Sequence, residues 1–243
     1  MRDEREATTL VRALPDWFAR HELGVLLALL AAAVSIWGFA EIADEVIEGE
    51  TDAVDRRVVA MLRSADNPGD ALGPAWVEEV GRDITALGGM AVLTLITLAV
   101  LGYLLFQGRR HTAVFVVVAV CGGLALSTLL KWAYDRPRPD IVPHLSHVVT
   151  SSFPSGHAMN SAVVYLTLGV LLARLVQARH IKAYFLLLAL MLTGLVGISR
   201  VYMGVHYPTD VLAGWAAGMA WATLCWLVAR VLQKRGIIAT SIV

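Results

Sequence analysis

Long apolar stretches separated by short charged ones dominate the chain. Six of these stretches approach the roughly 20 residues that a helix needs to span the hydrocarbon core of a bilayer. They cover residues 23–43, 84–106, 112–133, 158–176, 181–200 and 210–230. The pattern predicts an all-α fold, an integral membrane bundle of six transmembrane helices that forms one domain over residues 1–243.

Two polar segments flank the first stretch. Residues 1–22 carry mixed charges, with Leu10, Leu14, Trp17 and Phe18 at helical spacing, which predicts an amphipathic helix at the membrane surface. Residues 44–83 form an acidic extramembrane connection. Its sequence pattern predicts short helices, one of them around Val54 to Arg63, and chain-breaking residues follow that helix. We expect this connection to lie over the membrane face near a functional site and to carry no catalytic group.

Composition strengthens the membrane assignment. Hydrophobic residues make up 57% of the chain and charged residues 16%, with a mean hydropathy of +0.65. Soluble domains are nearer to about 25% charged. The 20 basic residues balance the 20 acidic ones, so nothing indicates nucleic acid as a partner. Cys121 and Cys225 lie within apolar runs and indicate packing rather than a disulfide or a metal site.

Basic residues also predict the orientation. With six spans, both termini share a side with the second-to-third and fourth-to-fifth connections, and that side holds 12 of the 20 Lys and Arg residues. Because positively charged loops tend to stay in the cytoplasm, we expect both termini to be cytoplasmic. The third-to-fourth and fifth-to-sixth connections then face the periplasm or the outside.

The fifth-to-sixth connection holds an ionisable pair, His206 and Asp210. Ionisable groups at the end of a membrane segment are costly and mark functional sites by default. Pro208 fits the first turn of a helix, which brings the Asp210 carboxylate to one ring nitrogen of His206 and leaves the other free as a nucleophile or base. Taken alone, the pair fits equally well a helix-capping aspartate and an interfacial histidine.

Three cations flank the two outward connections. Lys131 and Arg138 stand where two prolines stop the third stretch, and Arg200 ends the fifth. Each alone fits a cation that anchors a helix at the interface. Together on one side they suit a phosphoryl group, whose oxygens guanidinium binds in bidentate fashion.

The fourth stretch begins with Pro154-Ser155-Gly156-His157. Ser155 can cap the helix, Gly156 lets the backbone approach a ligand closely, and the free amides of a helix N-terminus bind anions. Pro-Ser-Gly is also ordinary turn chemistry. Capping does not require His157, however, so a histidine at this position favours a functional site over a plain helix start.

The three segments together resemble the signature of the type 2 phosphatidic acid phosphatase family, which shares a wider group with bacterial acid phosphatases and vanadium haloperoxidases. The matching pattern is Lys131-x6-Arg138-Pro139, then Pro154-Ser155-Gly156-His157, then Ser199-Arg200-x5-His206-x3-Asp210. It covers residues 131–210 directly, and the six-span layout extends it over most of the chain.

The resemblance implies a lipid phosphate phosphatase without cofactor or metal, in the bacterial cytoplasmic membrane with its site at the outer face. It implies that His206 attacks phosphorus and becomes a phosphohistidine, that Asp210 fixes its tautomer, and that His157 protonates the leaving oxygen and then activates water. The phosphoryl oxygens are then held by Lys131, Arg138, Ser155, Gly156 and Arg200. We expect a bell-shaped pH–rate profile and full activity in EDTA.

Substrate and reaction type leave alternatives. The implied substrates include phosphatidic acid, phosphatidylglycerol phosphate, undecaprenyl pyrophosphate and a lipid A phosphate, and the motifs do not distinguish the lipid tail. A covalent intermediate also permits a phosphotransferase. A vanadate-dependent haloperoxidase is a further alternative, against which six apolar stretches argue. A non-catalytic lipid carrier is expected to lack His157 or His206, and both are present.

Two nearby groups of ionisable residues do not predict ligand-binding sites. Asp135, Arg136 and Asp140 predict a local ion-pair set rather than ligands. His144 and His147 stand three residues apart, but without a third ligand they do not predict a metal site.

Overall fold

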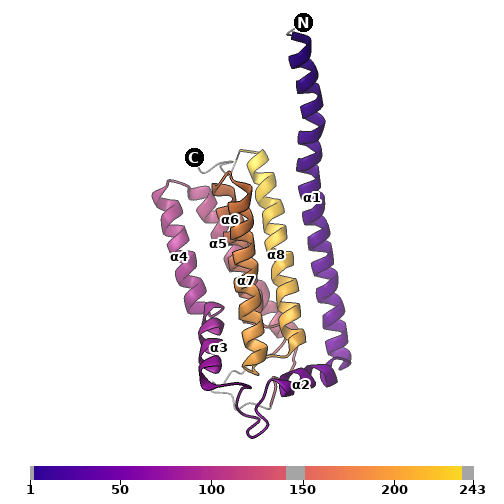
Figure 1. Cartoon of the computed structure of the whole chain (residues 1–243), viewed down its shortest axis with the longest axis vertical. Helices are drawn as coiled ribbons and strands as arrows, with labels where there is room; N and C mark the ends of the chain where they lie inside the picture. Colours follow the sequence, from indigo (N-terminus) through magenta and orange to yellow (C-terminus); the bar gives the residue numbers. More distant parts are fainter. Residues whose placement is uncertain (1–2, 141–150, 237–243) are drawn as a thin grey trace.

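The computed structural model describes residues 3–140 and 151–236, with the backbone alone described for residues 3–22. His144 and His147 lie outside the described residues. Within them the chain forms helices and no strand, apart from one isolated bridge between Arg63 and Ala71 (Figure 1). The all-α prediction is confirmed. The helices are α1 (Asp3–Glu48), α2 (Asp52–Met61), α3 (Ala75–Leu87), α4 (Met90–Phe106), α5 (Arg110–Ala133), α6 (Gly156–Leu175), α7 (Arg179–Tyr202) and α8 (Pro208–Lys234).

Five of the described helices are long and apolar enough to cross a membrane: the part of α1 over Leu23–Glu48, and α5, α6, α7 and α8. The remaining predicted span, residues 84–106, which is the second along the chain, is wrong as one straight helix. The structure divides it between α3 and α4, which meet at an angle of 47°. Counted as one broken span, this pair brings the total to six, as the sequence predicts.

The break between α3 and α4 lies at Gly88-Gly89. A Cβ on Gly88 would lie 2.3 Å from Cγ1 of Val196 in α7, so the backbone approaches α7 more closely than any side chain allows. Gly89 takes an extended conformation, with φ −74° and ψ 149°, and α4 begins directly after it. The kink therefore follows from close packing against α7 rather than from a proline.

The N-terminal segment is helical, as predicted, but it is not a separate element. α1 runs without interruption from Asp3 to Glu48, so residue 22 is not a helix end. At about 1.5 Å per residue, its 46 residues extend for about 69 Å. Figure 1 shows the N-terminal part of α1 projecting past the other helices. No proline or glycine stands between residues 16 and 23 to end the helix.

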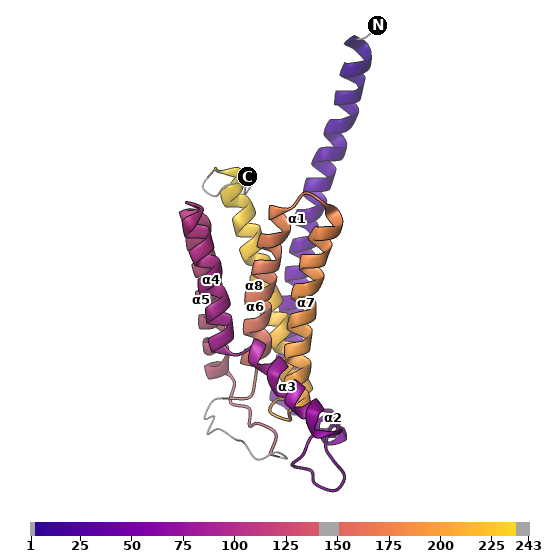
Figure 2. The ribbon, with the colours of Figure 1, turned by 60° about the vertical axis from the view of Figure 1, so that its left-hand side comes forward.

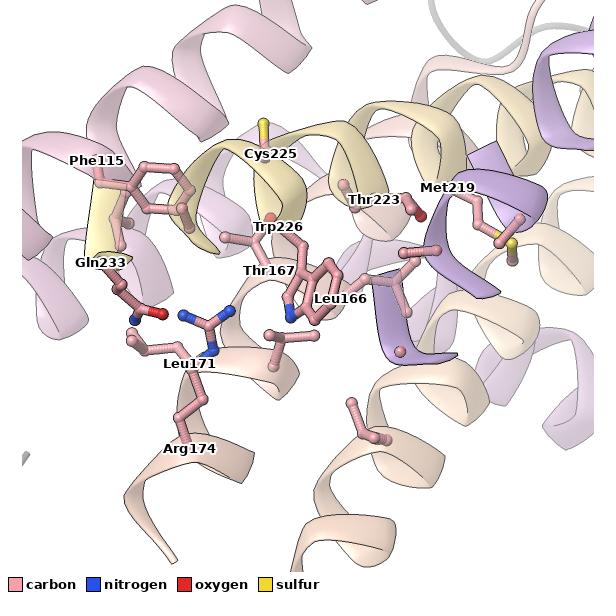
Figure 3. A pocket seen from close by; sticks show the side chains of 18 of the residues that line it. Phe115, Leu166, Thr167, Leu171, Arg174, Met219, Thr223, Cys225, Trp226 and Gln233 are labelled. Carbon is pink, nitrogen blue, oxygen red and sulfur yellow. The ribbon is translucent and has the colours of Figure 1, made fainter. Parts of the chain in front are cut away.

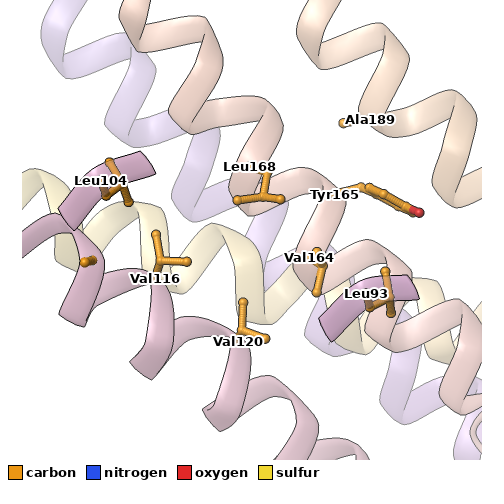
Figure 4. Packing of buried hydrophobic residues seen from close by; sticks show 9 residues of the cluster. Leu93, Leu104, Val116, Val120, Val164, Tyr165, Leu168 and Ala189 are labelled. Carbon is orange, nitrogen blue, oxygen red and sulfur yellow. The ribbon is translucent and has the colours of Figure 1, made fainter. Parts of the chain in front are cut away.

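The apolar core lies between α4, α5, α6 and α7. Its buried side chains interdigitate around α6 (Figure 4), and they are Leu93, Leu104, Ala113, Val116, Val120, Val164, Tyr165, Leu168 and Ala189. On its other side α6 packs against α8. There, a Cβ on Gly218 would lie 2.6 Å from the Ala162 side chain, so a glycine at this position allows the two helices to pack closely.

The connection between the first two spans lies over the end of the bundle where α7 ends and α8 begins (Figure 2). The predicted helix there is confirmed as α2, with slightly shifted bounds. The hydroxyl of Tyr202, the last residue of α7, donates to the carbonyl of Leu72 at 2.9 Å. The guanidinium of Arg63 donates to the carbonyl of the same Tyr202. The connection is thereby fixed beside the predicted site residues.

Candidate active site

The helix ends that carry the predicted site residues meet at one end of the bundle. Lys131 lies in the last turn of α5, Gly156 begins α6, Arg200 lies in the last turn of α7, and α8 begins at Pro208. The α5–α6 connection and the α7–α8 connection therefore lie at the same end of the bundle. We call the resulting group the candidate site; it contains Lys131, Arg138, Ser155, Gly156, His157, Arg200, His206 and Asp210.

His206 and Asp210 form the predicted pair. The Nδ1 atom of His206 lies 3.3 Å from Oδ2 of Asp210, and both side chains are buried. The backbone N–H of Tyr207 donates to the same Oδ2 atom at 2.9 Å. Asp210 therefore caps the start of α8 and also orients the imidazole. The capping contact and the contact with the imidazole are both present in one carboxylate, and the chemical role of the pair stays a prediction.

The other nitrogen of His206 faces the cations. Nη1 of Arg138 lies 3.3 Å from Nε2 of His206 and donates to the carbonyl of Val205 at 3.1 Å. A guanidinium can only donate and a carboxylate can only accept. The partners thus assign the ring proton to Nδ1, facing Asp210, and leave the Nε2 lone pair on the side of Arg138.

Burial keeps His206 neutral. It lowers the pKa of the imidazole from its usual 6.5 to about 3, opposed by Asp210 and reinforced by the charges of Arg200 and Arg138. A neutral imidazole retains the lone pair that a nucleophile or base requires. The site therefore holds His206 in its reactive form across the physiological pH range.

The buried imidazole predicts a fold that acid destabilises. Below about pH 6.5 the unfolded chain protonates His206, whereas the folded chain does so only near pH 3. Since the unfolded state then binds more protons, stability falls as the pH falls. Compared with His206→Asn, the parent is expected to lose about 2 kcal/mol between about pH 7.5 and about pH 5. Thermal unfolding in detergent measures this, and a difference independent of pH contradicts it.

The second motif lies against the first. Ser155 precedes α6, and its backbone N–H donates to the carbonyl of Asp210 at 2.8 Å, which joins the start of α6 to the start of α8. A Cβ on Gly156 would lie 3.1 Å from Cε of Lys131, so glycine gives the ammonium arm its room. Nζ of Lys131 donates to the carbonyl of Ser151 at 2.8 Å.

Two polar atoms in the candidate site are buried without a hydrogen-bond partner. They are Oγ of Ser155 and Nε of Arg200. Buried polar groups are nearly always paired, so such exceptions require an explanation. Both atoms belong to residues predicted to hold phosphoryl oxygens.

His157 lies in the first turn of α6, near the break between α3 and α4. Its Nε2 atom is 3.9 Å from the position that a Cβ on Gly89 would take. The charges of Arg200, Arg138 and Lys131 all act on its imidazole, as does His206. The charges of Arg138 and Arg200 therefore act on both histidines, and that of Lys131 acts on His157, so residues of separate segments come together as the motifs predict.

Arg136 was expected to belong to a local ion-pair set, and that expectation is wrong. Its Nη1 atom lies 2.8 Å from Oδ1 of Asp210, and its Nη2 atom lies 2.8 Å from Oδ2 of Asp55 in α2. Nη2 also contacts the half-exposed Asp52 at 3.0 Å, whereas Asp140 lies near Arg56 at 3.7 Å. Arg136 therefore joins the 44–83 connection to the Asp210 carboxylate.

Two hydroxyls complete this network and were missed from the sequence. Ser152 donates to Oδ2 of Asp210, and Thr209 donates to Oδ2 of Asp55. The sequence does contain one signal: Asp55 lies four residues before Val59, on the apolar side of α2, and both are buried. A carboxylate on a buried helix face requires a cationic partner.

A protein family, several proteins of similar sequence and a solved structure resemble this chain. A family model described as the PAP2 superfamily matches residues 112–234. Phosphatidylglycerophosphatase B of Bacillus subtilis is 35% identical over 146 residues, which cover 59% of this chain and 71% of that protein. Lipid A 1-phosphatase of Rhizobium etli is 31% identical over 188 residues, which cover 68% and 75%. The crystal structure of a transmembrane PAP2 type phosphatidylglycerolphosphate phosphatase from Bacillus subtilis superposes with a TM-score of 0.72 at 26% identity, over 83% of this chain and 96% of that one.

Proposed function

The chain belongs to the PAP2 superfamily, and from that premise we propose that it cleaves its substrate through a phosphohistidine at His206 without a metal ion. The protein is an integral membrane enzyme, a phosphatase that acts on lipid phosphates. One observation carries the proposed mechanism. The proton of His206 faces Asp210, while the Nε2 lone pair faces Arg138 and the neighbouring cations.

In the first step, Nε2 of His206 attacks phosphorus and the bond from phosphorus to the lipid oxygen breaks. His157 donates a proton to that departing oxygen, so the lipid leaves as a neutral alcohol or as a lipid monophosphate. Asp210 stabilises the positive charge that develops on the imidazole. The phosphoryl group is then bound to His206.

In the second step, water attacks the phosphohistidine. His157, now neutral, accepts a proton from the water, and the bond between phosphorus and Nε2 breaks. Inorganic phosphate leaves, and both histidines return to their starting states. At the start of the cycle His157 must be protonated and His206 neutral, and these two requirements together give the expected bell-shaped pH–rate profile.

Charge stabilisation is assigned to the three cations. Lys131 and Arg200 lie in the last turns of α5 and α7, and Arg138 is held by its hydrogen bond to the carbonyl of Val205. The three cations are thus in place before substrate arrives and need little reorganisation as charge spreads over the phosphoryl oxygens. The unpaired Oγ of Ser155 and the backbone amide of Gly156 add donors at the N-terminus of α6. These groups together take the part that a metal ion plays in other phosphatases.

We favour a glycerophospholipid phosphomonoester such as phosphatidylglycerol phosphate as the substrate. The support is the similarity to a protein named phosphatidylglycerophosphatase B and to a structure of the same type.

We further propose that both termini are cytoplasmic and that the candidate site faces the periplasm or the outside, because of the distribution of basic residues. A reporter active in only one compartment, fused after Val243, tests this orientation; periplasmic activity contradicts it.

Purified protein in detergent is expected to release inorganic phosphate from phosphatidylglycerol phosphate at the same rate with and without EDTA. Phosphatidic acid, undecaprenyl pyrophosphate and a lipid A phosphate complete the panel and rank the substrates. Since the cations of the site replace a metal, chelation removes nothing that the reaction uses. Activity that EDTA abolishes and a divalent ion restores contradicts the mechanism. Added vanadate separates a phosphatase, which it inhibits, from a haloperoxidase, which it activates.

A further inference from the structure

A cavity of about 440 Å³ lies toward the opposite end of the bundle from the candidate site. It is bounded by the N-terminal parts of α5 and α7 and the C-terminal parts of α6 and α8, with one wall from α1. On α6, Arg174 lines it and is separated from His157 by about 25 Å along the helix axis. Catalysis as proposed above makes no use of this cavity, so the inference drawn from it goes beyond that function.

The polar side chains of the cavity gather at one end. Figure 3 shows the guanidinium of Arg174, the amide of Gln233 and the indole nitrogen of Trp226 directed toward one region, while apolar side chains and threonines such as Thr223 line the rest. Arg230 lies over the Trp226 ring at 5.3 Å, and its charge acts on Arg174. A guanidinium at the outer end of an apolar cavity, with a second positive charge acting on it, is complementary to an anion.

Among the side chains that the structure describes, no carboxylate pairs with Arg174. Deeper in the cavity, Oγ1 of Thr167 is buried and has no hydrogen-bond partner. The cavity is thus apolar along its length, cationic at its outer end, and lined by one hydroxyl whose hydrogen bond is unmade.

The apolar part of the cavity opens sideways. Leu27 of α1 and Leu190 of α7 both line it and retain 56% and 46% of their surfaces exposed. In a membrane, such side chains contact lipid tails. A chain from the surrounding bilayer can therefore pass between α1 and α7, while a headgroup stays near the arginines at the membrane surface.

We propose that this cavity is a binding site for an anionic glycerophospholipid from the leaflet opposite the candidate site. Its acyl chain occupies the space between α1, α6, α7 and α8, and its phosphate accepts hydrogen bonds from Arg174, with Arg230 adding charge. The bound lipid joins α1 to the rest of the bundle and stabilises the protein without being hydrolysed, because no nucleophile of the candidate site reaches it.

The test compares phosphatidylglycerol with phosphatidylethanolamine of identical acyl chains, added to the purified full-length protein in detergent. Binding is measured by native mass spectrometry and by the rise in unfolding temperature. Phosphatidylglycerol is expected to bind the parent more tightly and to raise that temperature more. Arg174→Gln is expected to weaken its binding on the order of tenfold, the loss of one charge-assisted hydrogen bond. Ala222→Phe, which fills the space for the tail, is expected to abolish the preference.

Two matched variants serve as controls. Arg179→Gln removes an exposed cation of the same membrane face that does not line the cavity, and it is expected to bind phosphatidylglycerol as the parent does. Arg200→Ala alters the candidate site, and the binding is expected to persist. Equal binding of the two lipids, binding unchanged by Arg174→Gln, or binding lost in Arg200→Ala overturns the proposal. None of these outcomes depends on whether the enzyme releases phosphate.

Discussion

Replacing His206 with alanine is expected to lower the rate of phosphate release by about 10⁴-fold or more. The substitution removes the atom that forms the covalent bond, and no other described side chain of the candidate site combines a neutral nitrogen with a carboxylate partner. The measurement is the initial rate of phosphate release by purified parent and variant. His180→Ala is the matched control, because His180 is exposed near the start of α7, at the other end of the bundle, and its loss is expected to leave the rate unchanged.

The same pair of proteins tests for the intermediate. With a lipid whose terminal phosphate is radiolabelled, acid-free quenching is expected to trap label on the parent and none on His206→Ala. His157→Asn is expected to retain more label than the parent, because the water that cleaves the phosphohistidine is no longer activated. Label bound equally by His206→Ala places the covalent bond elsewhere and contradicts the assignment of the nucleophile.

Substituting Arg136 with glutamine is expected to destabilise the protein by about 3–5 kcal/mol. The guanidinium is 8% exposed and pairs with Asp55 and Asp210, which are 1% and 0% exposed. Without it, two carboxylates remain in the interior with too few donors, and the cost is that of an unpaired buried charge. Thermal unfolding in detergent measures the effect, which corresponds to a fall in Tm on the order of 10 °C.

An exposed ion pair nearby provides the control for this effect. Arg56 lies 3.7 Å from Asp140, and both side chains are more than half exposed. Pairs of this kind contribute about 0–1 kcal/mol, so Arg56→Gln is expected to change Tm little. A second variant, Arg136→Met combined with Asp55→Leu, removes the uncompensated carboxylate of α2 and is expected to recover part of the stability. Equal effects of Arg136→Gln and Arg56→Gln contradict a buried network.

The parts of the site that the sequence predicted are those fixed by local geometry. Asp210 follows His206 by one helical turn, and Pro208 determines where that turn begins, so their contact depends on a few residues. The motif around Gly156 is local in the same way. The helices α5 to α8 were predicted well because a span requires an uninterrupted apolar run of a length that the bilayer sets.

The features that escaped prediction depend on distant contacts. The kink at Gly88 depends on Val196 of α7, which the local sequence does not specify. Arg136 stands between Asp135 and Pro137, and sequence proximity suggested the wrong partner. Its true partners, Asp55 and Asp210, are brought to it by the docking of α2 on α8. Arg174 likewise fits an ordinary loop cation until the cavity beside it is seen.

The bridge from Asp55 through Arg136 to Asp210 has a consequence for synthesis at the ribosome. Asp55 follows α1 and Asp210 lies in α8, so the Asp210 carboxylate receives its full set of partners only after α8 has been synthesised. Under the proposed mechanism, a chain translated only as far as α7 is therefore expected to be inert toward the lipids among which it is assembled.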